Sequence, residues 1–396
     1  MATASNKLLY GIRESTFATA PTSGAMTRLR NVSESLDLTG ETATSEEMSG
    51  NRRAPYNRQA GRTVGGTLKA EFTYGADTLF NLENVMCGTA TAMTKTAITL
   101  SVVASTRTIA DSASGIDVNK FRTGEKISIT GFTTAGNNVT NAVIASVTSA
   151  GIVLTADTTT LEDEDAGDSV TITSGTLRLI AGTTRRSVMY LRDQSDITTG
   201  RYRSFVGVQS DELSLEYAPK KFNNYSVTFK GIDDASSDSA PSGVTLGAIT
   251  ETNPQNAIES SVTVGGTAVG VVTAYSVKLP NGIGVTDVIG SAVGAIAGGV
   301  TDTTIDNIKP TATLTVLLND SSAAYDTSMK AGTVMAIEAT SADLEGNKIR
   351  IGLPSAKVTS APESGDGNAV RTKALTIAAD HNSTIGGAIY IDFIPA

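Results

Sequence analysis

One arrangement of segments occurs twice along the chain, and it restricts the fold more than any other feature of the sequence. Each copy has a strand, a long arm, a second strand, a short helix and further strands. In the first copy the segments are residues 33–38, 41–66, 66–75 and 77–88. In the second copy they are residues 274–279, 284–309, 311–320 and 323–332. The copies share little identity, so the repeat depends on segment order and length. A duplicated open β-unit with projecting arms is suited to assembly rather than to chemistry.

The strands are predicted from alternating apolar and polar residues. Leu68, Ala70, Phe72 and Tyr74 alternate with polar side chains, which gives a strand one dry and one wet face. The same alternation occurs in residues 212–217, 225–230, 275–279 and 348–353. A composition dominated by Thr, Ala, Gly, Ser and Val is typical of all-β proteins. The sequence therefore predicts antiparallel sheets arranged as a sandwich or barrel.

Each copy carries one predicted short helix. In the first, Asp77 is the expected N-cap, Gly88 the expected left-handed C-cap, and Leu79, Leu82 and Met86 the apolar stripe. The second helix has Ser322 before it, Tyr325 and Met329 one turn apart, and Gly332 after it. We expect both helices to cover one open face of their sheets.

The length of 396 residues predicts two or three domains. About eighty additional residues interrupt the first copy before the strand at 186–193, and they contain strands of their own. This insert is expected to be a small β-barrel or an immunoglobulin-like module. The residues 233–243 are expected to be a linker. The predicted division is a discontinuous first domain (1–95 and 176–235), the insert (96–175), a linker with connecting strands (236–269) and a second domain (270–396).

The sequence predicts no catalytic residue, no metal and no cofactor. The single cysteine, Cys87, and the single histidine, His381, are far apart in sequence and leave little for a catalytic triad or a zinc site. The segment 161–168 offers five carboxylates. It lacks the spacing of a calcium-binding loop, which favours a solvated acidic loop over a metal site.

Charge and hydropathy exclude further classes. A net charge of −9 argues against gripping nucleic acid, which requires clustered Lys and Arg. There is no apolar run of about 18 residues, so no membrane span is expected. Arg13 and Glu14 interrupt the N-terminal segment, which therefore does not match a signal peptide and predicts a cytoplasmic product.

The first arm contains a basic cluster around an aromatic residue. Arg52, Arg53, Arg58 and Arg62 surround Tyr56. Such a pattern is typical either of a nucleic-acid patch or of an arm that pairs with acidic surface on a neighbouring subunit. The preceding residues 41–48 are acidic, and the sequence pI is about 4.8. The subunit interface is therefore the favoured interpretation.

Several of these segments resemble the tail tube proteins (major tail proteins) of tailed bacteriophages with long, usually non-contractile tails. The resemblance is carried by YGIRESTFATAP, the SESL strand, the EEMSGNRR arm, GTLKAEFTYGADTLFNLENVMCG and, in the insert, EKISITGF with AGNN. It covers most of the chain, although the insert departs from the minimal family pattern. It implies two tandem tail-tube-type domains, each lending strands to an inner β-barrel, with six domains to a ring. It also implies stacked rings, arms that reach neighbouring subunits, and a tube through which double-stranded DNA passes. The tape measure protein and tail terminator are the implied assembly partners, and the implied location is the virion tail, assembled in the host cytoplasm.

Two fused domains predict a ring of three chains with pseudo-sixfold symmetry, the alternative being a hexamer. The insert is expected on the outside of the tube, which favours a bare, flexible tail of the siphovirus type. In the family the lumen tends to be acidic. The candidate lumen residues are Asp37, Glu71, Glu212 and Glu216, with solvent exposure outside the tube or pairing with Lys69 and Lys278 as the alternative.

Two other functions remain open from the sequence. A surface adhesin or fibre of immunoglobulin-like repeats shares the Thr-rich composition, but it would predict a secretion signal and repeats of roughly 100 residues, and neither is evident. A depolymerase would require paired carboxylates in a cleft. The absence of Trp and the 5% aromatic content argue against it.

Overall fold

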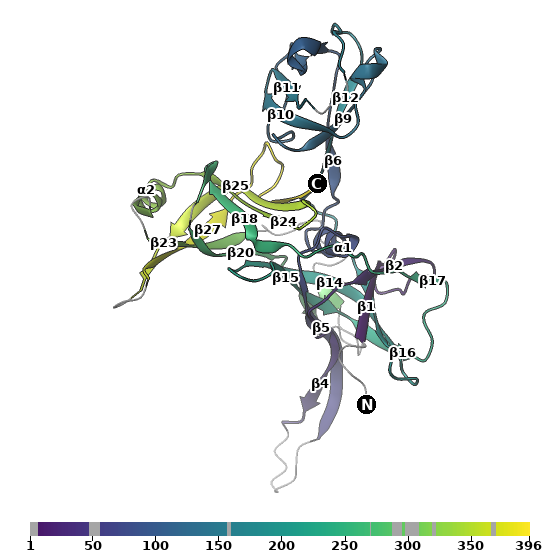
Figure 1. The fold of residues 1–396 in the computed structure, drawn as a ribbon. Helices are drawn as coiled ribbons and strands as arrows, with labels where there is room; N and C mark the ends of the chain where they lie inside the picture. Colours follow the sequence, from purple (N-terminus) through teal and green to yellow (C-terminus); the bar gives the residue numbers. More distant parts are fainter. Residues whose placement is uncertain are drawn as a thin grey trace.

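The computed structural model is mainly β, with two short helices and one large mixed sheet (Figure 1). It describes residues 7–46, 56–156, 160–269, 271–286, 295–297, 309–318, 322–365 and 370–396. The strands outside the insert in the first part of the chain are β1 (Lys7–Arg13), β2 (Gly24–Leu29), β3 (Ser33–Glu34), β4 (Asp37–Thr44), β5 (Asn57–Glu71), β13 (Val188–Gln194), β14 (Tyr202–Tyr217), β15 (Asn224–Gly231) and β16 (Asp233–Ser237). Helix α1 (Ala76–Val85) follows β5.

The second part of the chain repeats this sequence of elements. Its strands are β17 (Val244–Leu246), β18 (Asn256–Val264), β19 (Thr267–Ala268), β20 (Val272–Pro280), β21 (Gly284–Thr286), β22 (Ala295–Ala297), β23 (Thr311–Leu317), β24 (Met335–Ala342), β25 (Lys348–Ser360), β26 (Glu363–Ser364), β27 (Thr372–Ala379) and β28 (Tyr390–Ile394). Helix α2 (Ala323–Ala331) follows β23. The predicted order of strand, arm, strand, helix and strands is thus present in both parts.

The pairing of the strands repeats as well. The first part pairs its strands in the order β4–β5–β15–β14–β13–β1. The second part pairs them in the order β20–β23–β27–β25–β24–β18. We call these two groups of strands the first and the second half. The repeat therefore extends from segment order to hydrogen-bonded topology, while the domain boundaries stay a prediction.

The two halves are joined by β14. Its first residues pair with β13 and β16, and its last residues pair with β15 on one side and β20 on the other. Leu213 lies opposite Leu279, and Leu215 lies opposite Val277. A run of eight strands, β4–β5–β15–β14–β20–β23–β27–β25, therefore passes through both halves without a break in pairing.

One face of this run forms the main core, as the alternation predicts. The buried side chains include Leu68, Ala70 and Phe72, with Tyr74 partly buried against them. The same holds for the other predicted apolar faces: Leu213, Leu215, Tyr217, Tyr225, Val227, Phe229, Tyr275, Val277, Leu279, Ile349, Ile351 and Leu353. The strand predictions from two-residue periodicity are confirmed at these positions.

The cap predictions for α1 are wrong. The N-cap is Gly75, and Asp77 lies buried in the first turn, where its Oδ1 accepts a hydrogen bond from the Thr73 hydroxyl at 3.4 Å. Cys87, not Gly88, takes the left-handed conformation, with φ of 51°. Gly88 is required for a different reason: a Cβ there would lie 2.2 Å from the carbonyl oxygen of Ile180.

The other helix predictions agree with the structure. Leu82 and Met86 are buried, and Leu79 packs against the same core. Helix α2 ends at Gly332, whose φ is 62°, and its Tyr325 and Met329 also pack on the core. Helix α1 contacts β14 and β2, and α2 contacts β25.

The first arm, predicted at residues 41–66 between two strands, is a β-hairpin in the structure. Strands β4 and β5 pair from Asp37 opposite Gly65 to Thr44 opposite Asn57, and Figure 1 shows this hairpin extending away from the body of the molecule. The predicted arm residues 47–55 lie outside the described residues. In the second arm, β21 pairs with β22, and the predicted residues 287–294 and 298–308 lie outside the described part.

The expected linker at 233–243 begins with a strand instead. Residues 233–237 form β16, which pairs with the first residues of β14. Strand β17 follows and pairs in parallel with β2. The chain therefore returns along the first half before it enters the second.

The insert has its own core, and Figure 1 shows it projecting away from the strands of the two halves. It stays part of the large sheet, because β12 pairs with β28. Its core includes Leu100, Ile109, Phe121, Ile129 and Ile152. Its strands are β6 (Thr91–Ala97), β7 (Leu100–Val103), β8 (Thr108–Asp111), β9 (Lys126–Thr130), β10 (Ala142–Thr148), β11 (Gly151–Leu154) and β12 (Val170–Ile180). Short 3-10 turns occur at Ala104–Thr106 and Ala135–Asn137. In the part of the chain that the structure describes, no helix has both the length and the apolar character needed to cross a membrane.

Candidate assembly surfaces

The face opposite the main core is a continuous polar surface across both halves, and we call it the wet face. Lys69 lies opposite Ser226, and Ser226 lies opposite Ser214. Ser214 lies opposite Lys278, which in turn lies opposite Thr311. Directly opposed residues share one face of a sheet. This row of polar side chains therefore crosses the junction between β14 and β20.

The four candidate lumen carboxylates lie on the wet face by register. Glu71 and Glu216 are both opposite Asn224 on β15, from its two sides. Glu212 lies opposite Thr228, and Asp37 lies opposite Gly65. All four belong to the first half, whereas the wet face of the second half is rich in threonine: Thr311, Thr313, Thr315, Thr372 and Thr376.

Lysines on the same face approach two of these carboxylates. The Lys69 ammonium is 3.9 Å from Glu216, and the Lys278 ammonium is 3.8 Å from Glu212. These pairs are largely exposed, so their mutual stabilisation is small. The alternative pairing of these carboxylates with Lys69 and Lys278 is therefore present. That this face points toward a lumen stays a prediction.

Asp37 has the most constrained carboxylate of the four. Its Oδ1 accepts a hydrogen bond from the Leu38 N–H at 2.8 Å and lies 2.7 Å from Nη1 of Arg203. Burial acts to raise the pKa of Asp37, but the Leu38 N–H and the Arg203 guanidinium lower it below the ordinary value. Asp37 is therefore ionised at neutral pH.

The described arm residues present an exposed aromatic group beside positive charge. Tyr56 is 82% exposed. Arg58, two residues later in β5, is exposed as well. Nη2 of Arg62 is 2.7 Å from Oδ2 of Asp233, so that side chain is held by its own chain. Arg52 and Arg53 lie outside the described residues.

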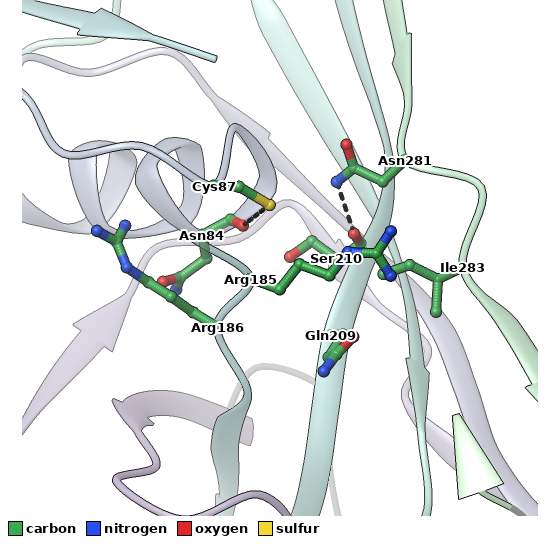
Figure 2. A pocket seen from close by; sticks show the side chains of 8 residues that line it. All are labelled: Asn84, Cys87, Arg185, Arg186, Gln209, Ser210, Asn281 and Ile283. Carbon is green, nitrogen blue, oxygen red and sulfur yellow. Dashed lines mark hydrogen bonds between the residues drawn. The ribbon is translucent and has the colours of Figure 1, made fainter. Parts of the chain in front are cut away.

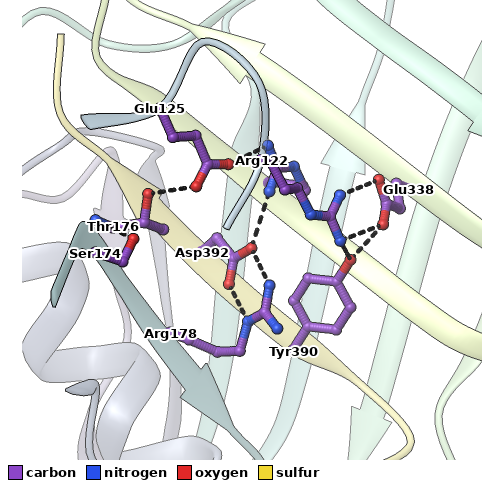
Figure 3. A network of polar contacts seen from close by, with 9 residues as sticks. Arg122, Glu125, Ser174, Thr176, Arg178, Glu338, Tyr390 and Asp392 are labelled. Carbon is purple, nitrogen blue, oxygen red and sulfur yellow. Dashed lines mark hydrogen bonds and ion pairs between the residues drawn. The ribbon is translucent and has the colours of Figure 1, made fainter. Parts of the chain in front are cut away.

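A network of charged side chains joins the insert to the second half (Figure 3). Arg122 of the insert donates two hydrogen bonds to the Glu338 carboxylate on β24, at 2.8 and 2.9 Å. Glu125 accepts from Arg350 on β25 at 2.7 Å and from the Thr176 hydroxyl at 2.9 Å. Bidentate arginine–carboxylate pairs fix both distance and orientation.

The network continues to the last strand of the chain. Asp392 on β28 accepts two hydrogen bonds from Arg178 on β12, at 2.7 and 2.8 Å, and one from Arg350 at 3.1 Å. The Arg178 guanidinium also lies 4.4 Å from the centre of the Tyr390 ring. Three arginines thus balance three carboxylates between the insert and the second half. No sequence motif indicates this network, because residues that contact each other in it lie up to 268 positions apart in the sequence.

These surfaces are suited to contact between protein chains, and comparison with known families agrees. The phage tail tube protein family matches residues 3–380. The chain belongs to this family. The search of curated proteins found no match to the chain. As a member of the family, the chain is a structural, non-enzymatic component of the phage tail tube. It is located in the virion tail and assembles with copies of itself. The adhesin and depolymerase alternatives are therefore set aside.

The cysteine of this tail tube protein lies in a small pocket with no catalytic partner among its lining residues (Figure 2). The Cys87 thiol points to the carbonyl oxygen of Asn84 at 3.8 Å, and burial raises its pKa. Asn281 closes the same region by donating to the carbonyl oxygens of Val85 at 2.7 Å and Ser210 at 2.9 Å. His381 is exposed and lies just after β27. The pocket is therefore structural.

The acidic segment 161–168 is used to order a loop of the insert. The Glu164 carboxylate accepts from the N–H groups of Thr133 and Thr134 at 2.8 and 3.1 Å, and from the Asn137 amide at 2.6 Å. Asp168 accepts from the Thr133 N–H at 2.7 Å. Within the described ranges, no group of three or more His, Cys, Asp or Glu residues is placed to hold a metal ion.

Proposed function

We propose that three copies of this tail tube protein form each ring of the tube, with the six repeated halves arranged around a hollow centre. One observation carries the proposal: β14 and β20 pair directly, so two similar groups of strands are already joined edge to edge. Sheet edges expose N–H and C=O groups that require partners. A head-to-tail contact repeated by rotation closes into a ring. Each half then acts as one tube domain, and three chains supply six.

Electron microscopy of tubes assembled from the purified protein tests this stoichiometry. The expected image is a hollow tube whose rings have threefold symmetry and a pseudo-sixfold outline, with a mass per ring of three chains. Rings of six chains would contradict the stoichiometry. Monomers or solid fibres, under conditions in which virion tails form, would contradict tube formation by this chain alone.

The wet face is the surface that we infer to line the bore and to guide double-stranded DNA. This face is rich in Thr and Ser, and its Lys69 and Lys278 each lie beside a carboxylate. Tight DNA binding depends on clustered, unpaired cations. Asp37, Glu71, Glu212 and Glu216 lie on this face by register. In a closed ring they would repeat around the bore and repel the phosphate backbone.

The arm formed by β4 and β5 is the element that we infer to contact the neighbouring ring. The hairpin extends away from the body of the chain (Figure 1), and the Tyr56 side chain near its tip is largely exposed. Large exposed aromatic residues are characteristic of the centres of protein interfaces. Arg58 adds positive charge beside Tyr56 on an acidic protein, so acidic surface on a neighbouring copy is the complementary partner.

The insert is expected on the outer surface of the tube. Figure 1 shows it at the end of the molecule opposite the arm, and its charge network holds it to the second half. A contractile sheath would have to contact that surface closely. We therefore infer a long, non-contractile tail of the siphovirus type, assembled in the host cytoplasm with a tape measure protein and a tail terminator. A sheath around this tube in images of intact virions would contradict the assignment.

A further inference from the structure

The two halves of the chain form the same kinds of sheet edge, but among the described residues one of the two possible junctions is filled within a chain. That junction pairs residues 212–217 of β14 with residues 275–280 of β20. The second possible junction would join the counterpart of β20 in the first half to the counterpart of residues 212–217 in the second half. The paired registers identify both counterparts.

The counterpart of β20 is the strand made by β3 and β4. Leu68 and Leu314 occupy the same position in their halves, opposite Val227 and Leu375 of the repeated strands β15 and β27. On the other side, Leu68 lies opposite Glu34 and Leu314 lies opposite Tyr275. Glu34 therefore corresponds to Tyr275. It follows that Leu36 corresponds to Val277 and Leu38 to Leu279.

The counterpart of residues 212–217 is the segment 361–365, where β25 continues along β27 into β26. Tyr225 lies opposite Ala70, two residues after Leu68, and Lys373 lies opposite Val316, two residues after Leu314. Tyr225 therefore corresponds to Lys373. Leu215 is opposite Tyr225, and Glu363 is opposite Lys373. Leu215 thus corresponds to Glu363.

The segment 361–365 has free backbone groups along its outer side. The Pro362 carbonyl accepts a hydrogen bond from the Ala374 N–H at 3.0 Å, so Pro362 turns its carbonyl toward β27. Successive residues of a strand turn their backbone groups to opposite sides. Ala361 and Glu363 therefore turn theirs away from β27, where no other strand of the described residues pairs with them. Proline lacks a backbone N–H. In Pro362 the position of the missing N–H is on the β27 side, so the outer edge loses no hydrogen-bond donor.

On the outer side of the strand made by β3 and β4, the backbone groups are instead hydrogen-bonded to side chains. The Asn281 N–H donates to the Asp211 carbonyl at 2.6 Å, which shows that Val277 and Leu279 turn their backbone groups toward β14. Their counterparts are capped by side chains of the same chain. Arg192 donates to the Leu36 carbonyl and to the Glu34 carboxylate, and two carboxylates accept from the N–H groups. The Leu36 N–H donates to Oε1 of Glu34 at 2.6 Å, and the Leu38 N–H donates to Oδ1 of Asp37 at 2.8 Å.

We propose that residues 34–38 of one copy pair antiparallel with residues 361–365 of the next, in the register of the β14–β20 junction. As the strands meet, Glu34 and Asp37 release the two N–H groups to carbonyl oxygens of the incoming strand, and Arg192 releases the Leu36 carbonyl to an N–H of that strand. Ser35 then lies opposite Ser364, as Ser276 lies opposite Glu216 within the chain. The partner is a second copy of this chain, and the inference rests on the ring proposed above. Side-chain caps of this kind keep a sheet edge from indiscriminate pairing.

Disulfide cross-linking tests the register. The variant Ser35→Cys/Ser364→Cys should form a bond between chains in oxidised tubes, giving covalent species of up to three chains on a denaturing gel. Glu216→Cys/Ser276→Cys is the matched control, because it should form the equivalent bond within one chain, in monomer and tube alike. Ser35→Cys/Glu363→Cys should not link, because a shift of one residue turns the side chain to the other face.

Hydrogen exchange of the wild-type chain gives a second readout that requires no substitution. The amides of Leu36, Leu38, Ala361 and Glu363 should exchange more slowly in the tube than in the monomer. Unchanged exchange in intact tubes, or tubes in which only the control pair forms a disulfide, would overturn the register while leaving the tube itself intact. Wild-type protein that forms no rings would instead overturn the proposed function. If the cysteine variant does not assemble, wild-type exchange decides.

Discussion

The Arg178 guanidinium and the Asp392 carboxylate meet side by side, with Nε 2.7 Å from Oδ1 and Nη2 2.8 Å from Oδ2. The two side chains are 5% and 0% exposed. The pair connects β12, the strand that returns from the insert, to β28, the last strand of the second half. Part of the insert's attachment is therefore an ion pair that water barely reaches.

Replacing Arg178 by Met should lower the free energy of unfolding by about 3 kcal/mol, because it leaves a buried carboxylate with only part of its charge compensation. Chemical denaturation measures the change. The matched control is Lys357→Met, which removes a partner from the exposed pair with Asp380 (2.8 Å) and should cost less than about 1 kcal/mol. Equal losses of unfolding free energy in the two variants would show that burial does not increase the contribution of the Arg178–Asp392 pair to stability.

Stability should also decrease in acid through Glu338. Burial alone would raise the pKa of this carboxyl, but Arg122 and the Tyr390 hydroxyl lower it below 4.5. A lowered folded-state pKa stabilises the protein above the unfolded value and loses that contribution as pH falls through the folded value. In Glu338→Gln the melting temperature should therefore fall less steeply below about pH 4.5 than in the wild type. Parallel pH profiles would refute the role of this carboxylate.

Removing the Tyr56 ring should block tube growth without unfolding the chain. Tyr56→Ala deletes an exposed aromatic group, so the melting temperature of the monomer should stay the same. Sedimentation and electron microscopy should show few or no tubes. Leu344→Ala is the control, since Leu344 is 81% exposed in the turn between β24 and β25, and it should assemble normally. Normal tube assembly of Tyr56→Ala would show that the Tyr56 ring is not part of the interface between subunits.

Reversing charge on the wet face should impair DNA delivery after normal assembly. In Glu212→Lys/Glu216→Lys two carboxylates per chain become cations, which attract the phosphates that must slide past them. Phage carrying this variant should have normal tails but reduced infectivity and slower DNA ejection. Glu162→Lys, on the exposed loop of the insert, should behave as the wild type. Normal infectivity of the double variant would place these residues outside the bore.

Local patterns in the sequence predict much of this fold. Two-residue alternation identifies the strands, because a strand with one dry face leaves that pattern wherever it lies. The caps of α1 were predicted wrongly, because the same residue types serve other purposes there. Asp77 is buried in the first turn, and burial raises its pKa. Gly88 makes room for the carbonyl oxygen of Ile180.

The contacts between distant segments could not be predicted from the sequence. Arg122 and Glu338 are 216 residues apart, and neither stands in a motif that would indicate the other. The same holds for Leu213 and Leu279, since two alternating strands carry no record of which strand pairs with which. The repeat of segments predicted two similar groups of strands. It did not predict that β14 would extend far enough to join them.

The β14–β20 seam also has a kinetic consequence for the proposed ring. Three of its six seams are formed when each polypeptide folds, before any two molecules collide. By the law of mass action, closure from three bodies depends on the third power of protein concentration, whereas six separate domains would give the sixth power. A dilute pool of subunits early in infection can therefore nucleate a ring far more readily than separate domains could.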